Sequence, residues 1–387
     1  KEEIGENIVK KVLMLASVAS MINQFNMPNI YLLQQMGFEV HVACNFKEGS
    51  TCSDEKVELI KQDLQQLNIT YYQVDFSRSV YRLDRAVKAY YQVVQILREN
   101  QYEFIHCHSP IGGMIGRLAG HRTGTKVMYT AHGFHFFHGA PKRYWAFIYP
   151  IEKYCSKYTD ILITINQEDY KRAQRKFHAK RTEYIPGVGI DLEKLNQIQV
   201  DKKEKRKELG IPENAFVIFS IGEINKNKNH ETIVRAVAES GLRDIYYVIC
   251  GKGNEAGHVK ELAQELHIED RVKLLGFRTD AKQLCHCADI FAFPSQREGL
   301  GLSALEAMAA GLPLITSNVH GINDYSINGK SGYSCAPKDA HGFAEAIRKL
   351  YHSPEDRERM GQFNKEQVKR FDIHCVDIIM RKLYSEI

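Results

Sequence analysis

Two glutamates, Glu298 and Glu306, stand on either side of a turn that contains Gly299 and Gly301. An apolar helix is predicted directly after the turn, from Leu302 to Ala310. Glycines let a backbone approach a ligand closely, and the start of a helix offers free N–H groups and a positive dipole end, so the turn suits a phosphate. A carboxylate instead accepts hydrogen bonds from hydroxyl groups. The arrangement matches the order ribose, diphosphate, sugar in a nucleotide-sugar.

The turn belongs to a strand–turn–helix–strand unit. Apolar strands are predicted at Asp289–Phe293 before it and Leu314–Thr316 after it, and Gly311 is expected to end the helix. Such a unit is the building block of a parallel sheet. An ordinary βαβ turn with solvated glutamates explains any single residue here, whereas the combination favours a ligand site.

The motif Ser-x-Arg-Glu-Gly-x-Gly-x-x-x-x-Glu-Ala-x-Ala-x-Gly-x-Pro spans Ser295 to Pro313. It resembles the signature of retaining GT-B glycosyltransferases of glycosyltransferase family 4, among them bacterial capsular and exopolysaccharide enzymes. The resemblance implies that Glu298 contacts the donor sugar at the catalytic centre and that Glu306 binds the ribose hydroxyls. It also implies that the intervening backbone holds the diphosphate, which makes the following residues donor-binding candidates: Arg297, Gly299, Leu300, Gly301 and Leu302.

A second donor-binding stretch runs from Ser220 to His230, after a predicted strand. Lysines at the start of a helix oppose its dipole, which is tolerable if they reach an anion, so Lys228 is a diphosphate candidate. A solvated lysine on a polar loop is the alternative. The stretch resembles the family's Gly-Arg-Leu-x-x-x-Lys-Gly motif and includes Asn225, but Glu223 stands in the arginine position. Arg297 or Lys226 is the expected substitute for that arginine.

Two weaker matches concern the nucleotide. The turn Ile249-Cys-Gly251-Lys-Gly253 resembles the family's Gly-x-Gly turn near the nucleotide, and Leu275-Gly-Phe-Arg278 resembles a turn whose backbone meets the base. Gly251 and Arg278 are therefore expected to contribute to donor binding.

The first half of the chain carries the remaining candidates. A lone histidine is more often structural than catalytic, but His132 follows a predicted strand and precedes a glycine. The resemblance implies that it hydrogen-bonds the donor sugar or the departing phosphate. Ser20 and Asn23 follow the first strand, where the family often has a glycine-rich loop that this chain lacks. We expect these polar side chains to touch the acceptor.

Strands alternate with helices along the whole chain, which predicts an α/β fold with doubly wound parallel sheets. The resemblance implies the GT-B architecture, with two Rossmann-like domains facing a central cleft. A Gly- and Pro-rich stretch at 184–191 and a charged stretch at 201–208 are the predicted linker. The predicted domains are residues 1–190 on the acceptor side and 191–370 for the nucleotide-sugar, with the helix at 371–387 packing back on the first. The predicted strands are at 11–16, 39–44, 70–74, 104–106, 127–130, 161–165, 215–221, 246–250, 272–275, 290–293 and 314–316, and the helices at 22–35, 81–100, 141–157, 167–177, 230–239, 256–266, 302–310 and within 354–387.

Composition narrows the class of protein. The chain has 387 residues and is 44% hydrophobic, with no apolar run near the roughly 18 to 20 residues that a membrane span needs. Its opening residues are charged and unlike a signal peptide, so a cytoplasmic protein at the inner face of the membrane is expected. Residues 1–190 contain 24 Lys and Arg against 18 Asp and Glu, or +6, while the remainder has 28 against 29, or −1. The basic half suggests peripheral contact with an anionic partner such as a lipid headgroup, and no nucleic acid is expected.

The nine cysteines are scattered, which favours free thiols in a reducing compartment. Neither Cys285-His-Cys287 nor the histidines 132, 135 and 138 have a standard zinc spacing, and no Asp-x-Asp pair is present. We therefore expect metal-independent transfer, with no cofactor other than the nucleotide-sugar co-substrate, for which a UDP-sugar is the first choice.

The sequence thus predicts a glycosyltransferase that moves a sugar from a nucleotide-sugar to a saccharide or lipid-linked saccharide in surface polysaccharide synthesis. A nucleotide-sugar 2-epimerase of the same architecture and a non-catalytic sugar-nucleotide-binding subunit are the alternatives. A glycosidase is a third, but its paired carboxylates frame one scissile bond, whereas here they frame a phosphate turn.

Overall fold

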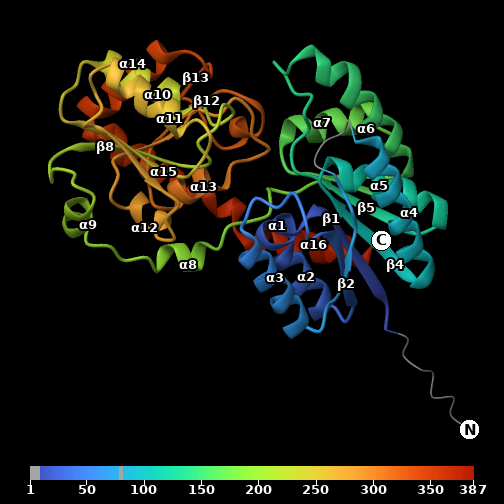
Figure 1. Cartoon of the computed structure of the whole chain (residues 1–387). Coiled ribbons are helices and arrows are strands. Elements are labelled where there is room, and N and C mark those ends of the chain that lie inside the picture. Colours follow the sequence, from blue (N-terminus) through green and yellow to red (C-terminus); the bar gives the residue numbers. More distant parts are fainter. Residues whose placement is uncertain (1–8, 78–81) are drawn as a thin grey trace, which may run out of the picture. The chain divides into compact units, whose positions relative to one another are not determined.

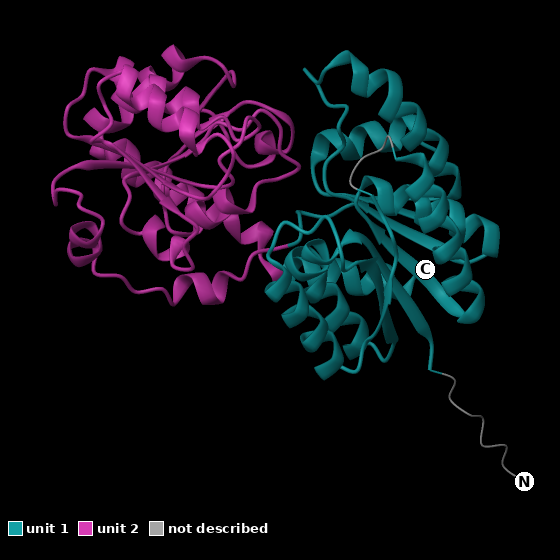
Figure 2. Cartoon of the chain, viewed as in Figure 1, with its two compact units in different colours: residues 1–188, 374–387 teal, residues 189–373 magenta. Residues whose placement is uncertain are grey.

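The computed structural model describes residues 9–77 and 82–387 and divides the chain into two compact units (Figure 2). Unit 1 comprises residues 1–188 and 374–387, and unit 2 comprises residues 189–373. The boundaries predicted from the sequence were at 190 and 371. The start predicted for the long helix at Tyr81 lies outside the described residues.

Unit 1 contains a seven-stranded sheet in which every pairing is parallel, in the order β3-β2-β1-β4-β5-β6-β7. This order is that of a doubly wound Rossmann-like fold, and it reverses between β1 and β4. The central strands are almost wholly buried, as their continuous apolar runs predicted. The strands are β1 (Lys11–Val18), β2 (Glu39–Asn45), β3 (Thr70–Gln73), β4 (Tyr102–His108), β5 (Lys126–Ala131), β6 (Ile161–Thr164) and β7 (Arg181–Tyr184).

The helices of unit 1 include one from the far end of the chain. In Figure 1 the C-terminal helix α16 (Ile373–Ser385) lies among the first elements of the chain. The Tyr384 ring stacks on Phe104 with centroids 5.8 Å apart, and its hydroxyl lies 2.8 Å from Nδ1 of His106. The other helices are α1 (Ala19–Met21), α2 (Met27–Gln35), α3 (Asp54–Gln66), α4 (Leu83–Glu99), α5 (Pro110–Thr123), α6 (Tyr149–Cys155) and α7 (Gln167–Lys176).

Unit 2 contains a six-stranded sheet, also parallel at every pairing, in the order β10-β9-β8-β11-β12-β13. The predicted fold class of two Rossmann-like parallel sheets is therefore confirmed. The strands are β8 (Phe216–Ile221), β9 (Ile245–Cys250), β10 (Val272–Gly276), β11 (Ile290–Phe293), β12 (Leu314–Ser317) and β13 (Gly332–Cys335). The helices are α8 (Leu192–Asn196), α9 (Lys202–Glu208), α10 (His230–Ser240), α11 (Ala256–Glu265), α12 (Ala281–Cys285), α13 (Leu302–Ala309), α14 (Ala340–His352) and α15 (Pro354–Gln367).

The structure differs from the predicted elements in several places. The charged stretch predicted as linker forms α9, because Arg206 turns inward and donates to the carbonyls of Cys287 and Ala215 at 3.0 and 2.7 Å. The predicted helices at 22–35 and 141–157 are each interrupted by a π-helical turn, Ile22–Asn26 and Tyr144–Ile148. The sequence did not predict the edge strands β7 and β13 or the helices α3, α8, α12 and α14.

Candidate active site

The predicted donor motifs of unit 2 lie where the strand order reverses. β8 and β11 are neighbours in the sheet, and the stretches after them begin at Gly222 and Pro294. Ligands of open α/β sheets bind beyond the carboxyl ends of strands at such a reversal. The fold therefore brings together two motifs that are about 70 residues apart in the sequence.

Hydrogen bonds from backbone and side-chain amides hold these two loops against each other. The amide of Gln296 donates to the carbonyl of Asn227 at 2.7 Å, and Asn227 Nδ2 donates to the carbonyl of Arg297 at 3.0 Å. Asn229, which has φ +57°, donates through Nδ2 to the carbonyl of Pro294 at 3.0 Å. The position of the Lys228 side chain relative to the glycine turn is thus fixed by both chain segments.

Lys228 and Glu298 form an ion pair, with Nζ 2.5 Å from Oε1. Nζ also lies 5.0 Å from the centre of the Phe293 ring, and the Lys228 amide donates to Oδ1 of Asn225 at 2.9 Å. The Lys228 and Glu298 side chains keep 21% and 14% of their surface exposed. An ammonium group has three donors, so Lys228 can bind a phosphate oxygen while it retains Glu298.

Glu306 is paired in the same way. Lys282, on α12, places Nζ 2.9 Å from Oε1 of Glu306, whose side chain is largely buried. Each glutamate of the motif therefore has a lysine from another element beside it. Sequence analysis did not identify Lys282, because nothing in its local pattern indicates which side chain it will meet.

The turn requires glycine at Gly301, the N-cap of α13, which has φ +99° and ψ 76°. A Cβ atom there would lie 2.6 Å from the Phe293 ring and 2.8 Å from Oη of Tyr325. The glycine turn places the backbone of Gly299, Leu300 and Leu302 at the N-terminal end of α13. Backbone N–H groups at this end of a helix have no intrahelical acceptor.

Tyr325 lies beneath this turn and was not identified from the sequence. Its side chain is fully buried, and its hydroxyl has no hydrogen-bond partner among the described residues. Burial raises the pKa of Tyr325 well above its ordinary value, and the nearby charges of Glu298 and Asp324 add to this effect. The hydroxyl thus stays protonated and remains available as a donor.

Three predicted donor residues have identifiable structural contacts. A Cβ atom at Gly251 would lie 1.8 Å from the Gly222 carbonyl oxygen, so this glycine permits the close approach of two loops. Arg278 is paired with Asp280 at 2.6 Å and Glu208 at 2.7 Å, and these bonds raise its pKa. Asn225 holds the backbone of Lys228.

Glu223 is exposed, and no basic side chain of the described residues lies within 4.0 Å of its carboxylate. The flanking backbone is fixed, because Gly222 and Ile224 donate to the carbonyls of Cys250 and Lys252 at 3.0 Å each. The backbone at Glu223 is therefore fixed, and its carboxylate has no basic partner in the described part of the chain.

In unit 1 the corresponding reversal lies between β1 and β4. Ser17 Oγ lies 2.5 Å from Ser109 Oγ and accepts from the Gly112 amide at 3.1 Å, so the two loops are joined. Ser20 is buried and accepts from the Thr51 amide at 3.2 Å. Asn23 lies half-buried in the π-helical turn.

His132, at the end of β5, lies half-buried beside two other rings. Its Nε2 is 3.1 Å from Nδ1 of His108, and its ring centre is 5.3 Å from that of Phe25. Desolvation lowers the pKa of His132 to about 4, so the ring is neutral at pH 7. A neutral imidazole has one donor and one acceptor nitrogen, which suits hydrogen bonding to a hydroxyl or phosphate oxygen.

Neither a metal-ligating cluster nor a membrane-spanning helix is present in the part of the chain that the structure describes. Across 9–77 and 82–387, no group of three or more His, Cys, Asp or Glu side chains is close enough to hold a metal ion. None of the helices in these ranges has the length and apolar character required to cross a bilayer. No disulfide bond joins cysteines of the described residues, and Cys44 and Cys250 are buried in their strands.

Comparison with known proteins gives consistent matches over both units. Residues 201–367 match the family description glycosyl transferases group 1, and residues 32–194 match Glycosyltransferase Family 4. EpsD of Bacillus subtilis (strain 168), assigned as a glycosyltransferase, is 34% identical over 98% of this chain and 97% of its own length. An Escherichia coli enzyme named UDP-Gal:alpha-D-GlcNAc-diphosphoundecaprenol alpha-1,3-galactosyltransferase is 27% identical over 86% of this chain and 85% of its own.

The fold also matches solved structures. Anabaena HepE, crystallised in complex with UDP and glucose, superposes with a TM-score of 0.78 at 20% identity and covers 98% of this chain and 100% of its own. At this level of identity the match concerns the fold.

Proposed function

Because the chain belongs to glycosyltransferase family 4 and is a GT-B glycosyltransferase, we propose that it transfers a sugar from a UDP-sugar with retention of anomeric configuration. The acceptor in this proposal is a saccharide or a lipid-linked saccharide of surface polysaccharide synthesis. The name of the Escherichia coli relative, which combines a UDP-sugar donor with a diphosphoundecaprenol-linked acceptor, supports both choices. The UDP bound to the structurally similar HepE supports the choice of UDP.

One observation carries the proposal: two lysine–glutamate pairs flank the turn at Gly301, Lys228 with Glu298 and Lys282 with Glu306. The turn suits a diphosphate, because the backbone N–H groups of the turn, the positive end of the α13 dipole and Lys228 all favour an anion. Glu298 then accepts from a sugar hydroxyl, and Glu306 accepts from the ribose hydroxyls.

In the proposed reaction the bond between the anomeric carbon and the diphosphate oxygen breaks, and both electrons leave with the diphosphate. Negative charge therefore grows on the departing group while the sugar becomes oxocarbenium-like. Fixed N–H groups and the Lys228 ammonium bind this growing charge more strongly than they bind the ground state, which lowers the barrier. The acceptor hydroxyl forms the new bond to the anomeric carbon on the face that the diphosphate leaves, and its proton passes to the departing phosphate oxygen.

His132 is the proposed contribution of unit 1 to the catalytic centre. Its position at the end of β5, its neutral ring and its partial exposure fit a hydrogen bond to the donor sugar or the phosphate. His108 beside it restrains the ring. Replacement of His132 by alanine is expected to lower turnover without weakening nucleotide binding by unit 2.

The proposed transfer does not depend on a metal, because the charge of the leaving group is met by Lys228 and backbone N–H groups and the sequence has no Asp-x-Asp pair. Activity should survive exhaustive treatment with EDTA. Loss of activity that a divalent ion restores would contradict this part of the proposal.

The enzyme is proposed to act at the inner face of the cell membrane, because a lipid-linked acceptor is held there and the first half of the chain carries a net charge of 24 − 18 = +6. Attraction of this kind weakens with salt, since the screening length is about 8 Å at physiological ionic strength.

Product analysis across a panel of nucleotide-sugars, with and without acceptor, tests the proposal. A glycosyltransferase releases one nucleoside diphosphate for each glycoside formed, and turnover depends on the acceptor. Conversion of the donor to its epimer without acceptor would identify the 2-epimerase. Binding without any turnover would identify the non-catalytic subunit, the alternative that the carboxylate at Glu223 keeps open.

A further inference from the structure

Residues 141–157 of unit 1 present an exposed apolar face. Phe147, Ile151 and Tyr154 are 70%, 44% and 52% exposed, and Trp145 is also exposed. The first three are spaced four and three residues apart along the π-helical turn and α6, so they share one side of the helix. Exposed large apolar groups gathered in this way mark an interaction site more often than scattered ones do. We refer to this side as the 141–157 face.

The other side of the same segment is anchored in the core. This anchoring keeps the side chains of the 141–157 face directed outward. Tyr144, Ile148 and Tyr149 pack on the hydrophobic core of unit 1. Glu152 is buried and accepts from the guanidinium of Arg117 at 2.7 Å. Arg117 is itself fully buried, and its Nε donates to the Gly113 carbonyl at 2.9 Å. The segment therefore cannot rotate to bury its exposed aromatic residues without breaking a buried ion pair.

The segment 141–157 is also positively charged. The segment has four basic residues, Lys142, Arg143, Lys153 and Lys157, and a single acidic one, Glu152, which Arg117 neutralises in the interior. No carboxylate of the described residues lies within 4.0 Å of these four basic groups, and Arg143 and Lys157 lie over the rings of Tyr144 and Tyr154. The segment that carries the apolar face therefore has four basic side chains without a carboxylate partner among the described residues, and two of them lie over its aromatic rings.

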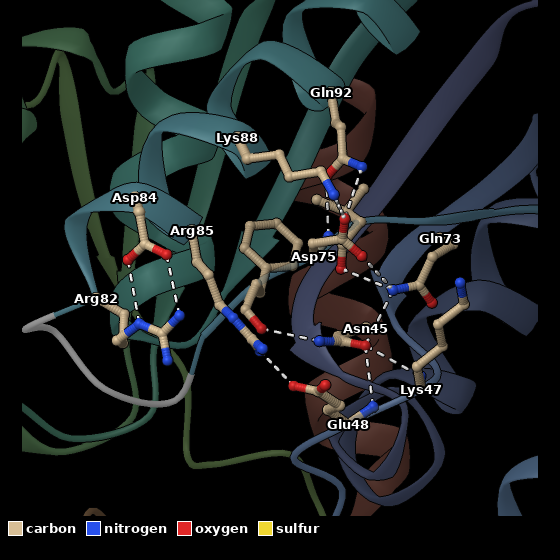
Figure 3. Close-up of polar contacts among 12 residues, drawn as sticks. Asn45, Lys47, Glu48, Gln73, Asp75, Arg82, Asp84, Arg85, Lys88 and Gln92 are labelled. Atoms are coloured by element: carbon tan, nitrogen blue, oxygen red, sulfur yellow. Dashed lines mark hydrogen bonds and ion pairs between the residues drawn. The ribbon is translucent and has the colours of Figure 1, made fainter.

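A second apolar stripe on unit 1 provides the comparison. Leu83, Val87 and Tyr91 are exposed along α4. Figure 3 shows Arg82, Arg85 and Lys88, which lie in the same stretch of the sequence, each with a carboxylate partner. The pairs are Arg82 with Asp84 at 3.0 Å, Lys88 with Asp75 at 2.7 Å, and Arg85 with Glu48. The α4 stripe is thus apolar but electrically balanced, whereas the 141–157 face is apolar and basic.

We propose that the 141–157 face docks unit 1 on an anionic lipid bilayer. Trp and Tyr favour the headgroup level, Phe and Ile enter the acyl boundary, and Lys and Arg attract anionic lipids. The occupant is a membrane because the face combines an apolar ridge with dispersed, unpaired positive charge, as interfacial helices do. The choice of a membrane as the occupant rests on the proposed function in one respect: a lipid-linked acceptor is held in a bilayer, so the enzyme must reach the bilayer surface.

Co-sedimentation of the full chain with lipid vesicles tests the proposal. Vesicles of phosphatidylglycerol mixed with phosphatidylcholine are compared with vesicles of phosphatidylcholine alone, at low and physiological salt. Two double variants are used, Lys142→Gln with Arg143→Gln for charge and Phe147→Ser with Ile151→Ser for apolar insertion. Leu83→Ser with Val87→Ser on α4 is the matched control, because both of its side chains are exposed to a similar extent.

The expected result is binding to the anionic vesicles that weakens with salt. The charge variant should bind about 25-fold more weakly, from about fivefold for each basic residue removed near an anionic surface. The apolar variant should also bind more weakly, while the α4 control binds as the unaltered chain does. Absence of binding to anionic vesicles at low salt would overturn the proposal, and so would an equal loss in the α4 control.

Affinity for UDP, measured in the same samples, separates this proposal from the proposed function. Unaltered UDP affinity and an unaltered unfolding midpoint in all variants would show that they are folded and that their donor site is intact. If the chain binds vesicles as predicted but binds no UDP, the docking proposal stands and the proposed donor is wrong.

Discussion

Lys228 and Glu298 form one ion pair, with Nζ 2.5 Å from Oε1, although the sequence predicted that they contact different groups of the donor, the diphosphate and the sugar. Their loops follow β8 and β11, which are adjacent in the sheet. The cation proposed for the diphosphate therefore also orients the carboxylate proposed for the sugar. A substitution at either position alters the charge felt at the other, so single variants measure the pair rather than one residue.

Glu306→Gln should weaken UDP binding, because a charged acceptor for the ribose hydroxyls becomes neutral. A hydrogen bond to a charged group contributes about 1.5–3 kcal/mol, which corresponds to roughly a tenfold to 150-fold rise in Kd. Isothermal titration calorimetry of UDP with the folded chain measures the effect. Glu261→Gln, at an exposed position on α11, is the matched control and should leave Kd unchanged. Equal affinity of Glu306→Gln and the unaltered chain would refute the ribose assignment.

Gly301→Ala should destabilise unit 2 and impair donor binding. The alanine would adopt φ +99° with its Cβ 2.6 Å from the Phe293 ring, and strain together with overpacking costs about 2–5 kcal/mol. Urea unfolding measures the loss. Gly257→Ala on α11 is the control, because its Cβ would meet nothing within 4 Å, and it should stabilise by up to about 1 kcal/mol. A stable Gly301→Ala chain with normal UDP affinity would show that the turn does not depend on glycine.

Acid should destabilise unit 1 through its buried histidines. Burial lowers the pKa of His106 from 6.5 to about 3, and the neighbouring His132 adds to this effect. The unfolded chain therefore takes up the proton first, so stability is lost as pH falls below about 6.5 and continues to fall towards pH 3. At pH 5 this single group should cost about 2 kcal/mol.

His106→Gln tests this assignment, because it should lose about 2 kcal/mol less than the unaltered chain between pH 7 and pH 5 in urea unfolding. The control is His341→Gln, at an exposed histidine whose pKa is raised by hydrogen bonding to Glu239, and it should not reduce the loss. An unchanged pH dependence in His106→Gln would contradict the assignment to His106.

The strand–turn–helix–strand segment around Glu298 could be predicted from the sequence because the residue patterns that indicate its elements are local. Apolar runs marked β11 and β12, and the Ala- and Leu-rich segment marked α13, which ends at Ala309 with Gly311 at φ +79° just beyond. The edge strands β7 and β13 were missed because their side chains are only partly buried and lack a continuous apolar run. The π-helical turns were missed because a hydrophobic period of 3.6 residues does not reveal an extra residue in one turn.

The members of the candidate site were predictable only in part. Lys228 and Glu298 carry motif positions, whereas Lys282 and Tyr325 enter the site through tertiary contacts that no local pattern specifies. Arg278 shows the converse, since its motif position suggested the nucleotide and the structure pairs it with Asp280 and Glu208. The position of a charged residue in the sequence does not reveal which partner it will find.

The central claim is that Lys228 stabilises the diphosphate as it departs, and the steady-state kinetics of Lys228→Ala at saturating donor test it most directly. If the ammonium binds charge that develops in the transition state, kcat should fall on the order of 100-fold. Lys260→Ala, at an exposed lysine on α11, should keep its kcat. If Lys228→Ala instead retains kcat and only KM rises, Lys228 binds donor and transition state equally, and its role towards the leaving group is wrong.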